Sequence, residues 1–417
     1  MNPNTPIKIT AETERVWLRR YGWGLALLGV AVGLFVGAGW WSGVLLDRQW
    51  LPATWLQWVT RRGLVLGLGL ALIPAIWRVC LAFDARYGGA LRKFSVAPFL
   101  ALVVVLGAES AFRLFRVQDV FWHSVIARAG EQFQAREVGL FRLDAASAQN
   151  GKHPSGYVVS GTSQLVYGLD VAELGRACGK PIYRRAVAGL FPVELTASQE
   201  FLTFDGDNML VTMLSGFDLG ARSDLTPAAM RPQATMRGMR NVFAASEPKF
   251  ILRHWRDFVD LFSAASCDLW RSRDYIRFLI ENPFSAYKSA HTQGEEIELA
   301  TQRDAYREMG ERTEMVDVAL RSLDKFFEEV SGRVRKIVVF EGQVNPAYPA
   351  QERLAVMSAQ MNKFLLKQQE LGRITYITRE QQGLDIPASE WRDMTHVTSD
   401  GRTRLTEMFV RQLCESP

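Results

Sequence analysis

Two residues near the end of the chain, Asp393 and His396, have the types and spacing of an acid–base pair. A carboxylate beside an imidazole fixes the ring's tautomer and stabilises the imidazolium that forms when the ring accepts a proton. The pair stands in Asp393-Met394-Thr395-His396, directly before a helical pattern, where a last loop can return to the edge of a sheet. We therefore predict that His396 is a general base oriented by Asp393. The alternative is a surface hydrogen bond without a catalytic role.

The nucleophile that this base would activate is Ser163. Residues 156–160 are a short run of apolar and β-branched side chains that ends in Gly161-Thr162-Ser163, which indicates a buried strand followed by a tight turn. A serine there would present its hydroxyl at the carboxyl end of a strand, where sites of open parallel sheets form. The alternative is a serine that only shapes the turn or caps a helix.

Further apolar runs separated by helical patterns predict the frame that positions these residues. Asp170 and Glu173 resemble a capping box that opens a short helix soon after Ser163. Strands that alternate with helices imply an α/β fold with a mostly parallel sheet covered on both faces, in three layers. The predicted strands are 156–160, 181–188, 209–214, 335–340 and 374–377.

A long, mainly helical insertion is predicted at about 220–330, between the third and fourth strands. Its helical stripes predict amphipathic helices. The insertion carries many arginines, which would form a solvated basic face or, alternatively, a wall or lid against an anionic or sugar-rich substrate. The stripes are Trp255, Phe258 and Phe262, and Tyr275, Ile276 and Leu279; the arginines are Arg253, Arg256, Arg271, Arg273 and Arg277.

The first part of the chain is strongly apolar and predicts three transmembrane helices. The runs 22–46, 63–83 and 94–112 reach the length needed to span about 30 Å of hydrocarbon, the last two only if one charge each is tolerated. Arg78 can extend toward the headgroups, and Glu109 and Arg113 can offset each other four residues apart. The alternative is buried core helices. Tryptophans cluster around the first hairpin as in an interfacial belt: Trp40, Trp41, Trp50, Trp55 and Trp58.

The distribution of Lys and Arg predicts that the N-terminus is cytoplasmic and that the domain after the third span is extracytoplasmic. The predicted division is a cytoplasmic segment at 1–21, three spans within 22–115 and an extracytoplasmic domain at 116–417, attached to a bacterial inner membrane. The side with more Lys and Arg has Lys8, Arg15, Arg19 and Arg20 before the first span and Arg86, Arg92 and Lys93 before the third. The side with fewer has Arg48, Arg61 and Arg62, between the first and second spans.

Several other function classes find no support in the composition. The net charge of +5 comes without Lys/Arg blocks, which argues against nucleic-acid binding. No glycine-rich phosphate loop is present, and neither histidines nor cysteines have metal-ligand spacing, so we expect no cofactor and no metal. The cysteines do not form a disulfide framework, although a single bridge among Cys178, Cys267 and Cys414 stays open. The fourth cysteine is Cys80, and the histidines are His123, His153, His254, His291 and His396.

The order of these blocks resembles that of SGNH/GDSL hydrolases and acyltransferases, over roughly residues 155–415 without the insertion. The blocks are strand-Gly161-Thr162-Ser163, strand-Gly189, strand-Gly216-Phe217-Asp218 and Asp393-Met394-Thr395-His396. The chain is most similar to the membrane-anchored branch that includes DltD-like and exopolysaccharide O-acetylation proteins. The segments Ser163-Gln164-Leu165-Val166-Tyr167-Gly168-Leu169-Asp170 and Val338-Val339-Phe340-Glu341-Gly342-Gln343-Val344-Asn345-Pro346 carry this likeness.

The resemblance implies an SGNH-type, flavodoxin-like three-layer domain with a Ser163–His396–Asp393 triad and no metal or cofactor. The N–H groups of Ser163 and Gly189 would bind the oxyanion. Asp218 departs from the pattern, because the family presents an Asn there whose amide donates to the oxyanion, and an ionised carboxylate cannot donate. Either the alignment is off by one residue, the site uses fewer donors, Asp218 is protonated, or the domain is catalytically weak.

Two functions follow as hypotheses. The first is a serine acyltransferase or esterase that moves an acyl group, most plausibly acetyl, onto or off a cell-envelope or secreted polysaccharide, with a multi-spanning membrane acyltransferase as the implied partner. The second is a catalytically degenerate scaffold or glycan-binding subunit of a membrane polysaccharide assembly. Asp218 and the large insertion favour the second hypothesis, whereas the ordered serine, glycine and Asp–His blocks favour the first.

Overall fold

The chain divides into two compact units, of which the larger contains Glu109–Ala148 and Lys152–Pro417 and is described below. The predicted membrane spans before residue 108 and their orientation lie outside the described residues. Within the part of the chain that is described, no helix is both long and apolar enough to cross a bilayer. The computed structural model describes residues 108–110, 112–113, 115–129, 133–149, 154–202, 207–220, 224–281, 313–347 and 352–415.

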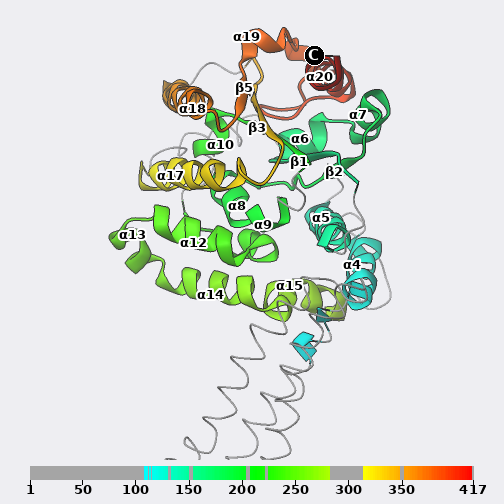
Figure 1. Cartoon of the computed structure of the whole chain (residues 1–417), viewed down its shortest axis with the longest axis vertical. Coiled ribbons are helices and arrows are strands. Elements are labelled where there is room, and N and C mark those ends of the chain that lie inside the picture. Colours follow the sequence, from blue (N-terminus) through cyan, green and yellow to red (C-terminus); the bar gives the residue numbers. More distant parts are fainter. Residues whose placement is uncertain are drawn as a thin grey trace, which may run out of the picture. The chain divides into compact units, whose positions relative to one another are not determined.

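A five-stranded parallel sheet forms the centre of this unit (Figure 1). Its order is β2-β1-β3-β4-β5, one of the common doubly wound arrangements. The predicted α/β class with a parallel sheet is therefore confirmed. The strands are β1 (Tyr157–Ser160), β2 (Ile182–Arg184), β3 (Met209–Leu214), β4 (Lys336–Glu341) and β5 (Thr375–Ile377).

Helices cover both faces of the sheet. Successive side chains of each strand point to opposite faces and therefore pack into two different cores. Val158 packs in one core and Val159 in the other. The Val159 core is shared with α6 (Ser163–Gly168), α7 (Val171–Cys178) and α20 (Ser399–Val410). The Val158 core is shared with α8 (Pro192–Ala197), α12 (Met236–Ala245), α17 (Thr313–Val330) and α18 (Glu352–Glu370).

Other short elements connect these layers. Asp170 caps α7 by accepting hydrogen bonds from the N–H groups of Ala172 and Glu173, each at 3.0 Å. Gly216 allows α10 to pack closely on α18, since a Cβ there would lie 2.4 Å from the Ser358 backbone nitrogen. These elements are α9 (Gln199–Leu202), α10 (Gly216–Gly220), α19 (Arg379–Gln382), the 3₁₀ helices Arg231–Gln233 and Ala388–Glu390, and a π-helical turn at Arg411–Glu415.

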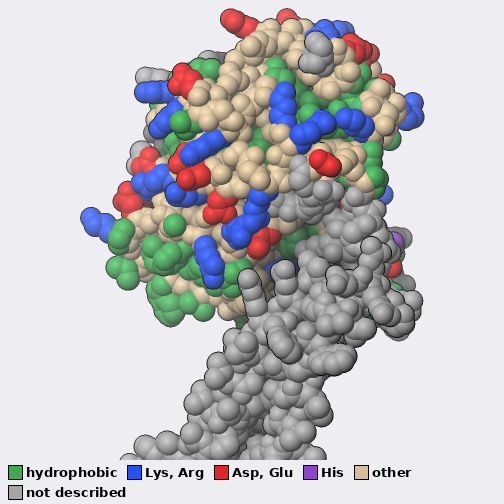
Figure 2. All heavy atoms as spheres, in the orientation of Figure 1, with side chains coloured by type: hydrophobic (Ala, Val, Ile, Leu, Met, Phe, Trp, Pro, Cys, Tyr) green, Lys and Arg blue, Asp and Glu red, His purple; other side chains and the backbone are tan. Residues whose placement is uncertain are grey.

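The described part of the insertion is mainly helical, as predicted, and α14 (Trp255–Ser266) and α15 (Asp268–Glu281) lie in the layer farthest from α19 and α20 (Figure 1). Phe258 is buried, but Trp255, assigned to the same apolar stripe, is 54 % exposed. Figure 2 shows hydrophobic side chains gathered over α13 and the start of α14. Its described helices are α11 (Pro227–Met230), the 3₁₀ helix Arg231–Gln233, α12, α13 (Pro248–Arg253), α14, α15 and α17.

The arginines predicted to form a basic face of the insertion are largely neutralised by acidic neighbours. Arg271 is buried and paired with Asp268. Arg256 instead lies over the Trp255 ring, 5.3 Å from its centroid. The solvated basic face is therefore mostly a set of ion pairs. The other pairs are Arg253–Glu314, Arg273–Asp260 and Arg277–Glu281.

Two helices precede the sheet, α4 (Phe115–Ala129) and α5 (Phe133–Gln149). Before them, Arg113 Nε donates to Glu109 Oε1 at 2.7 Å, which confirms the predicted pairing. Glu109 also accepts hydrogen bonds from the Asp268 and Leu269 N–H groups at the start of α15. Glu109 and Arg113 are thus both fastened to the insertion, since Arg113 Nη2 also donates to the Ser266 carbonyl at 2.7 Å.

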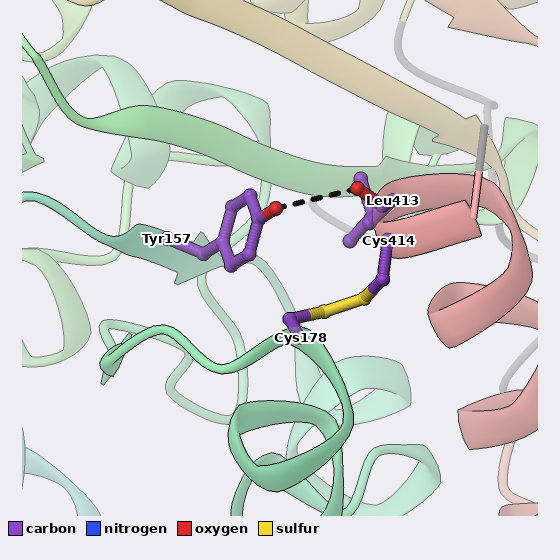
Figure 3. The surroundings of a disulfide bond; sticks show 4 residues. All are labelled: Tyr157, Cys178, Leu413 and Cys414. Carbon is purple, nitrogen blue, oxygen red and sulfur yellow. Dashed lines mark hydrogen bonds between the residues drawn. A yellow bond between two sulfur atoms is a disulfide. The ribbon is translucent and has the colours of Figure 1, made fainter. Parts of the chain in front are cut away.

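A disulfide joins Cys178 at the end of α7 to Cys414 near the C-terminus (Figure 3). The two Cα atoms are 5.1 Å apart, within the range that a disulfide spans. Beside it, the Tyr157 hydroxyl donates to the Leu413 carbonyl at 3.3 Å. Of the three cysteines left open by the sequence, Cys267 is the free one.

Candidate functional site

Ser163 lies at the first residue of α6, directly after β1. The chain turns between strand and helix at Gly161, whose φ is +154°. A Cβ at Gly161 would lie 2.8 Å from Leu165 Cδ1, so glycine permits α6 to fold back onto the strand. The serine hydroxyl is thereby placed at the carboxyl end of the sheet.

The structure brings Ser163, His396 and Asp393 together in one hydrogen-bonded chain. Ser163 Oγ lies 2.8 Å from His396 Nε2, and His396 Nδ1 lies 2.7 Å from Asp393 Oδ2. A carboxylate only accepts hydrogen bonds, so the proton of the neutral ring belongs on Nδ1. Nε2 is then free to accept the serine proton, as a general base requires.

The Asp–His loop is held by its own backbone and by the loop after β4. Asp393 Oδ1 accepts hydrogen bonds from the N–H groups of Thr395 and His396, each at 2.9 Å. Asn345 donates from its backbone to the Met394 carbonyl and from its side chain to the Asp393 carbonyl. The segment after β4 therefore positions the pair.

Asp393 is suited to remain ionised. Burial raises the pKa of this carboxyl group, but the hydrogen bond to His396, the charge of that ring and the backbone N–H groups outweigh it and lower the pKa below its usual value. An ionised Asp393 stabilises the imidazolium that forms when His396 takes a proton.

Gly189 lies in a tight turn next to the serine loop. Leu190 N–H donates to the Val187 carbonyl at 3.0 Å, and Val187 N–H donates to the Gly161 carbonyl at 3.1 Å. The φ of Gly189 is +81°, a value that suits glycine at the third position of a type II turn. This turn also ends β2 earlier than the predicted 181–188. Among the described residues no acceptor pairs with the Gly189 N–H.

The first N–H of a helix has no partner within the helix, which leaves the Ser163 N–H available as well. The turn and the start of α6 therefore offer two donors from neighbouring segments.

Asp218 is buried at the start of α10 and is turned back onto its own loop. Its Oδ2 accepts hydrogen bonds from Ser215 N–H at 2.8 Å and from Ser215 Oγ at 2.7 Å. Burial raises its pKa to about 6, against the lowering effect of these hydrogen bonds. Thr162, the residue before Ser163, also lowers this pKa, but no contact found among the described residues joins Asp218 to Ser163, His396 or Asp393, so its oxyanion role stays a prediction.

Three residues beside the site were missed by the sequence reasoning. Tyr167 packs edge-on against the His396 ring, with centroids 5.0 Å apart. Behind it, Glu137 of α5 accepts hydrogen bonds from Arg184 Nη2 at 2.9 Å and from Ala188 N–H at 3.0 Å. Glu137 belongs to no motif. Its only signal in the sequence is that an acidic residue stands next to the apolar Val138, on the side of a helix that is buried.

Within the described part of the chain, no group of three or more His, Cys, Asp or Glu side chains could hold a metal ion. The site as described is a serine, an imidazole, a carboxylate and backbone donors. No protein-family model matches this chain, and no curated protein matches it.

Proposed function

We propose that this chain is a serine-dependent acyltransferase or esterase that moves an acyl group, most plausibly acetyl, onto or off a cell-envelope or secreted polysaccharide. The observation that carries the proposal is the 2.8 Å contact between Ser163 Oγ and His396 Nε2, with Asp393 on the other ring nitrogen. A serine beside an oriented base is the arrangement that activates a hydroxyl for acyl transfer.

The proposed reaction proceeds in two halves through an acyl-enzyme. Ser163 Oγ attacks the acyl carbonyl carbon while His396 Nε2 takes the hydroxyl proton. The oxyanion accepts hydrogen bonds from the Ser163 and Gly189 N–H groups, a term of about 3 kcal/mol per donor in acyl-transfer sites. His396 then protonates the departing oxygen. In the second half His396 deprotonates a sugar hydroxyl or water, which attacks the acyl carbon; the bond from that carbon to Ser163 Oγ then breaks, and His396 returns the proton to Ser163 Oγ.

The fold supports assignment to an SGNH-type, flavodoxin-like three-layer domain. The strand order 2-1-3-4-5 is the one expected for that arrangement. Ser163 follows the first strand and the Asp–His pair precedes the last long helix, α20, in the block order of the SGNH/GDSL enzymes.

The polysaccharide and the partner come from the resemblance. An acyl donor made in the cytoplasm has to cross the membrane to reach an extracytoplasmic domain, which implies a multi-spanning membrane acyltransferase or another envelope-assembly subunit. The Cys178–Cys414 disulfide supports an oxidising, periplasmic location, since such bonds persist mainly outside the cytosol.

The test is labelling of the purified full-length protein by a fluorophosphonate probe, which reacts with activated serines. We expect labelling of the wild type, loss of the label in Ser163→Ala, and a large loss in His396→Ala, because the hydroxyl is a weak nucleophile without its base. Label retained by Ser163→Ala would disprove the proposed nucleophile.

A second candidate is a non-enzymatic scaffold or glycan-binding subunit. It is favoured by Asp218, a carboxylate where the family has an amide donor. Absence of labelling in folded wild-type protein, together with full function of Ser163→Ala in cells, would select it.

A further inference from the structure

The turn that contains Gly189 is held by a side chain from outside the sheet. Glu137, on α5, is only 3 % exposed. Its Oε2 accepts a hydrogen bond from the Ala188 N–H at 3.0 Å, and its Oε1 accepts one from Arg184 Nη2 at 2.9 Å. One carboxylate thus connects the end of β2 to the turn that follows it.

These contacts fix the peptide group between Val187 and Ala188 from both sides. Its carbonyl accepts the hydrogen bond from Leu190 that closes the turn, and its N–H is bound to Glu137. The orientation of this peptide sets the direction of the next one, which carries the Gly189 N–H. An error of about 1 Å in the position of a catalytic group can cost about 100-fold in rate.

We propose that Glu137 is a positioning residue of the acyl-transfer site, and that its ionised form holds the Val187–Leu190 turn so that the Gly189 N–H points at the oxyanion. The inference rests on the proposed function and deepens it, because it makes α5 part of the active machinery.

The protonation state of Glu137 supports this role. Burial raises its pKa to about 7, whereas the Ala188 N–H and the Arg184 charge lower it. Ionised acceptors form roughly twofold stronger hydrogen bonds than neutral ones, so the carboxylate holds the turn more firmly than the acid. The carboxylate fraction grows as pH rises through about 7. The charged and titratable groups that interact with Glu137 are Arg184 on β2 and Tyr167 on α6. Four more groups act on these two neighbours: Arg392 and Asp393 on Tyr167, and Arg136 and Arg402 on Arg184.

The experiment measures hydrolysis of p-nitrophenyl acetate by the purified full-length protein from about pH 5 to pH 9. In the wild type the ionisation of Glu137 should raise kcat by about tenfold as pH passes about 7, which steepens the slope of log kcat against pH there. For Glu137→Gln we expect kcat above about pH 8 to fall about tenfold, KM to stay within about twofold and the slope to lose this steepening.

A matched control is Glu109→Gln. Glu109 is also buried and also accepts hydrogen bonds from an arginine and from backbone N–H groups, but at the start of α15. This variant should keep the wild-type kcat and slope. Unchanged kcat or slope in Glu137→Gln, or the same losses in both variants, would overturn the inference.

Arg184→Gln provides a second measurement if Glu137→Gln fails to fold. Removing this cation raises the pKa of Glu137, so the rising part of the pH profile should move to higher pH; a profile that does not move counts against the inference. Ser163→Ala distinguishes a failure of the proposed function from a failure of the positioning role of Glu137. Hydrolysis that persists without Ser163 overturns both proposals, whereas hydrolysis that needs Ser163 but not Glu137 overturns only this one.

Discussion

Asp218 is a buried carboxyl group whose ionisation opposes folding. Its pKa of about 6, raised by burial, lies above the ordinary value of 3.8 for an aspartic acid. The folded state therefore binds the proton more tightly than the unfolded state. The stabilisation is complete below about pH 4 and is lost as pH rises to about 6, by roughly 3 kcal/mol for two pKa units.

Replacing Asp218 by Asn removes this titration. We expect the difference in unfolding temperature between Asp218→Asn and the wild type to shift in the variant's favour as pH rises from about 4 to about 6, because the amide carries no charge to bury. Thermal unfolding of the full-length protein over this range measures it. Parallel curves for the two proteins would show that Asp218 does not titrate as described.

Sequence spacing could nominate Ser163, Asp393 and His396, because each stands in a block whose order along the chain is informative. It could not nominate Glu137, whose contacts with Arg184 and Ala188 depend on how α5 packs beside the sheet. The sequence placed Asp218 in a block, but it could not show that Ser215 would donate two hydrogen bonds to the Asp218 carboxylate. A tertiary contact decided the first case, and the local conformation of the loop from Ser215 to Asp218 decided the second.

The strands were predictable because buried parallel strands are continuous apolar runs. β3 occupies the predicted 209–214, β4 is shifted by one residue from the predicted 335–340, and β5 begins one residue later than the predicted 374–377. β2 is shorter because its predicted range included the turn around Gly189. The exposure of Trp255 was not predictable from periodicity, which identifies a helical face but not the partner that covers it.

The pairing of Cys178 with Cys414 likewise depends on the fold, since it joins α7 to the end of the chain. We expect Cys414→Ser to lower the free energy of unfolding by about 2–5 kcal/mol, because the bond closes a very long loop in the unfolded chain. Denaturant unfolding checks this, with Cys267→Ser as the control because Cys267 is free. Equal losses in the two variants, or no effect of reductant on the wild type, would contradict the prediction.

At the scale of the whole molecule, the three predicted spans would place the C-terminal domain outside the cytoplasm. Alkaline phosphatase fused after Pro417 should be active in a bacterial host, because it folds only outside the cytoplasm, and a green fluorescent protein fused there should be dark. The reverse pattern would place the C-terminal domain in the cytoplasm and remove the extracytoplasmic part of the proposal.

The wide separation of Ser163 from His396 also orders events during synthesis. The two residues are 233 positions apart, so at ordinary elongation rates roughly 10–50 s pass between their appearance. Cys414, which fastens the last turn to α7, follows later still. A ribosome-bound chain therefore carries Ser163 long before His396, and under the proposed function a prematurely terminated product would lack acyl chemistry altogether.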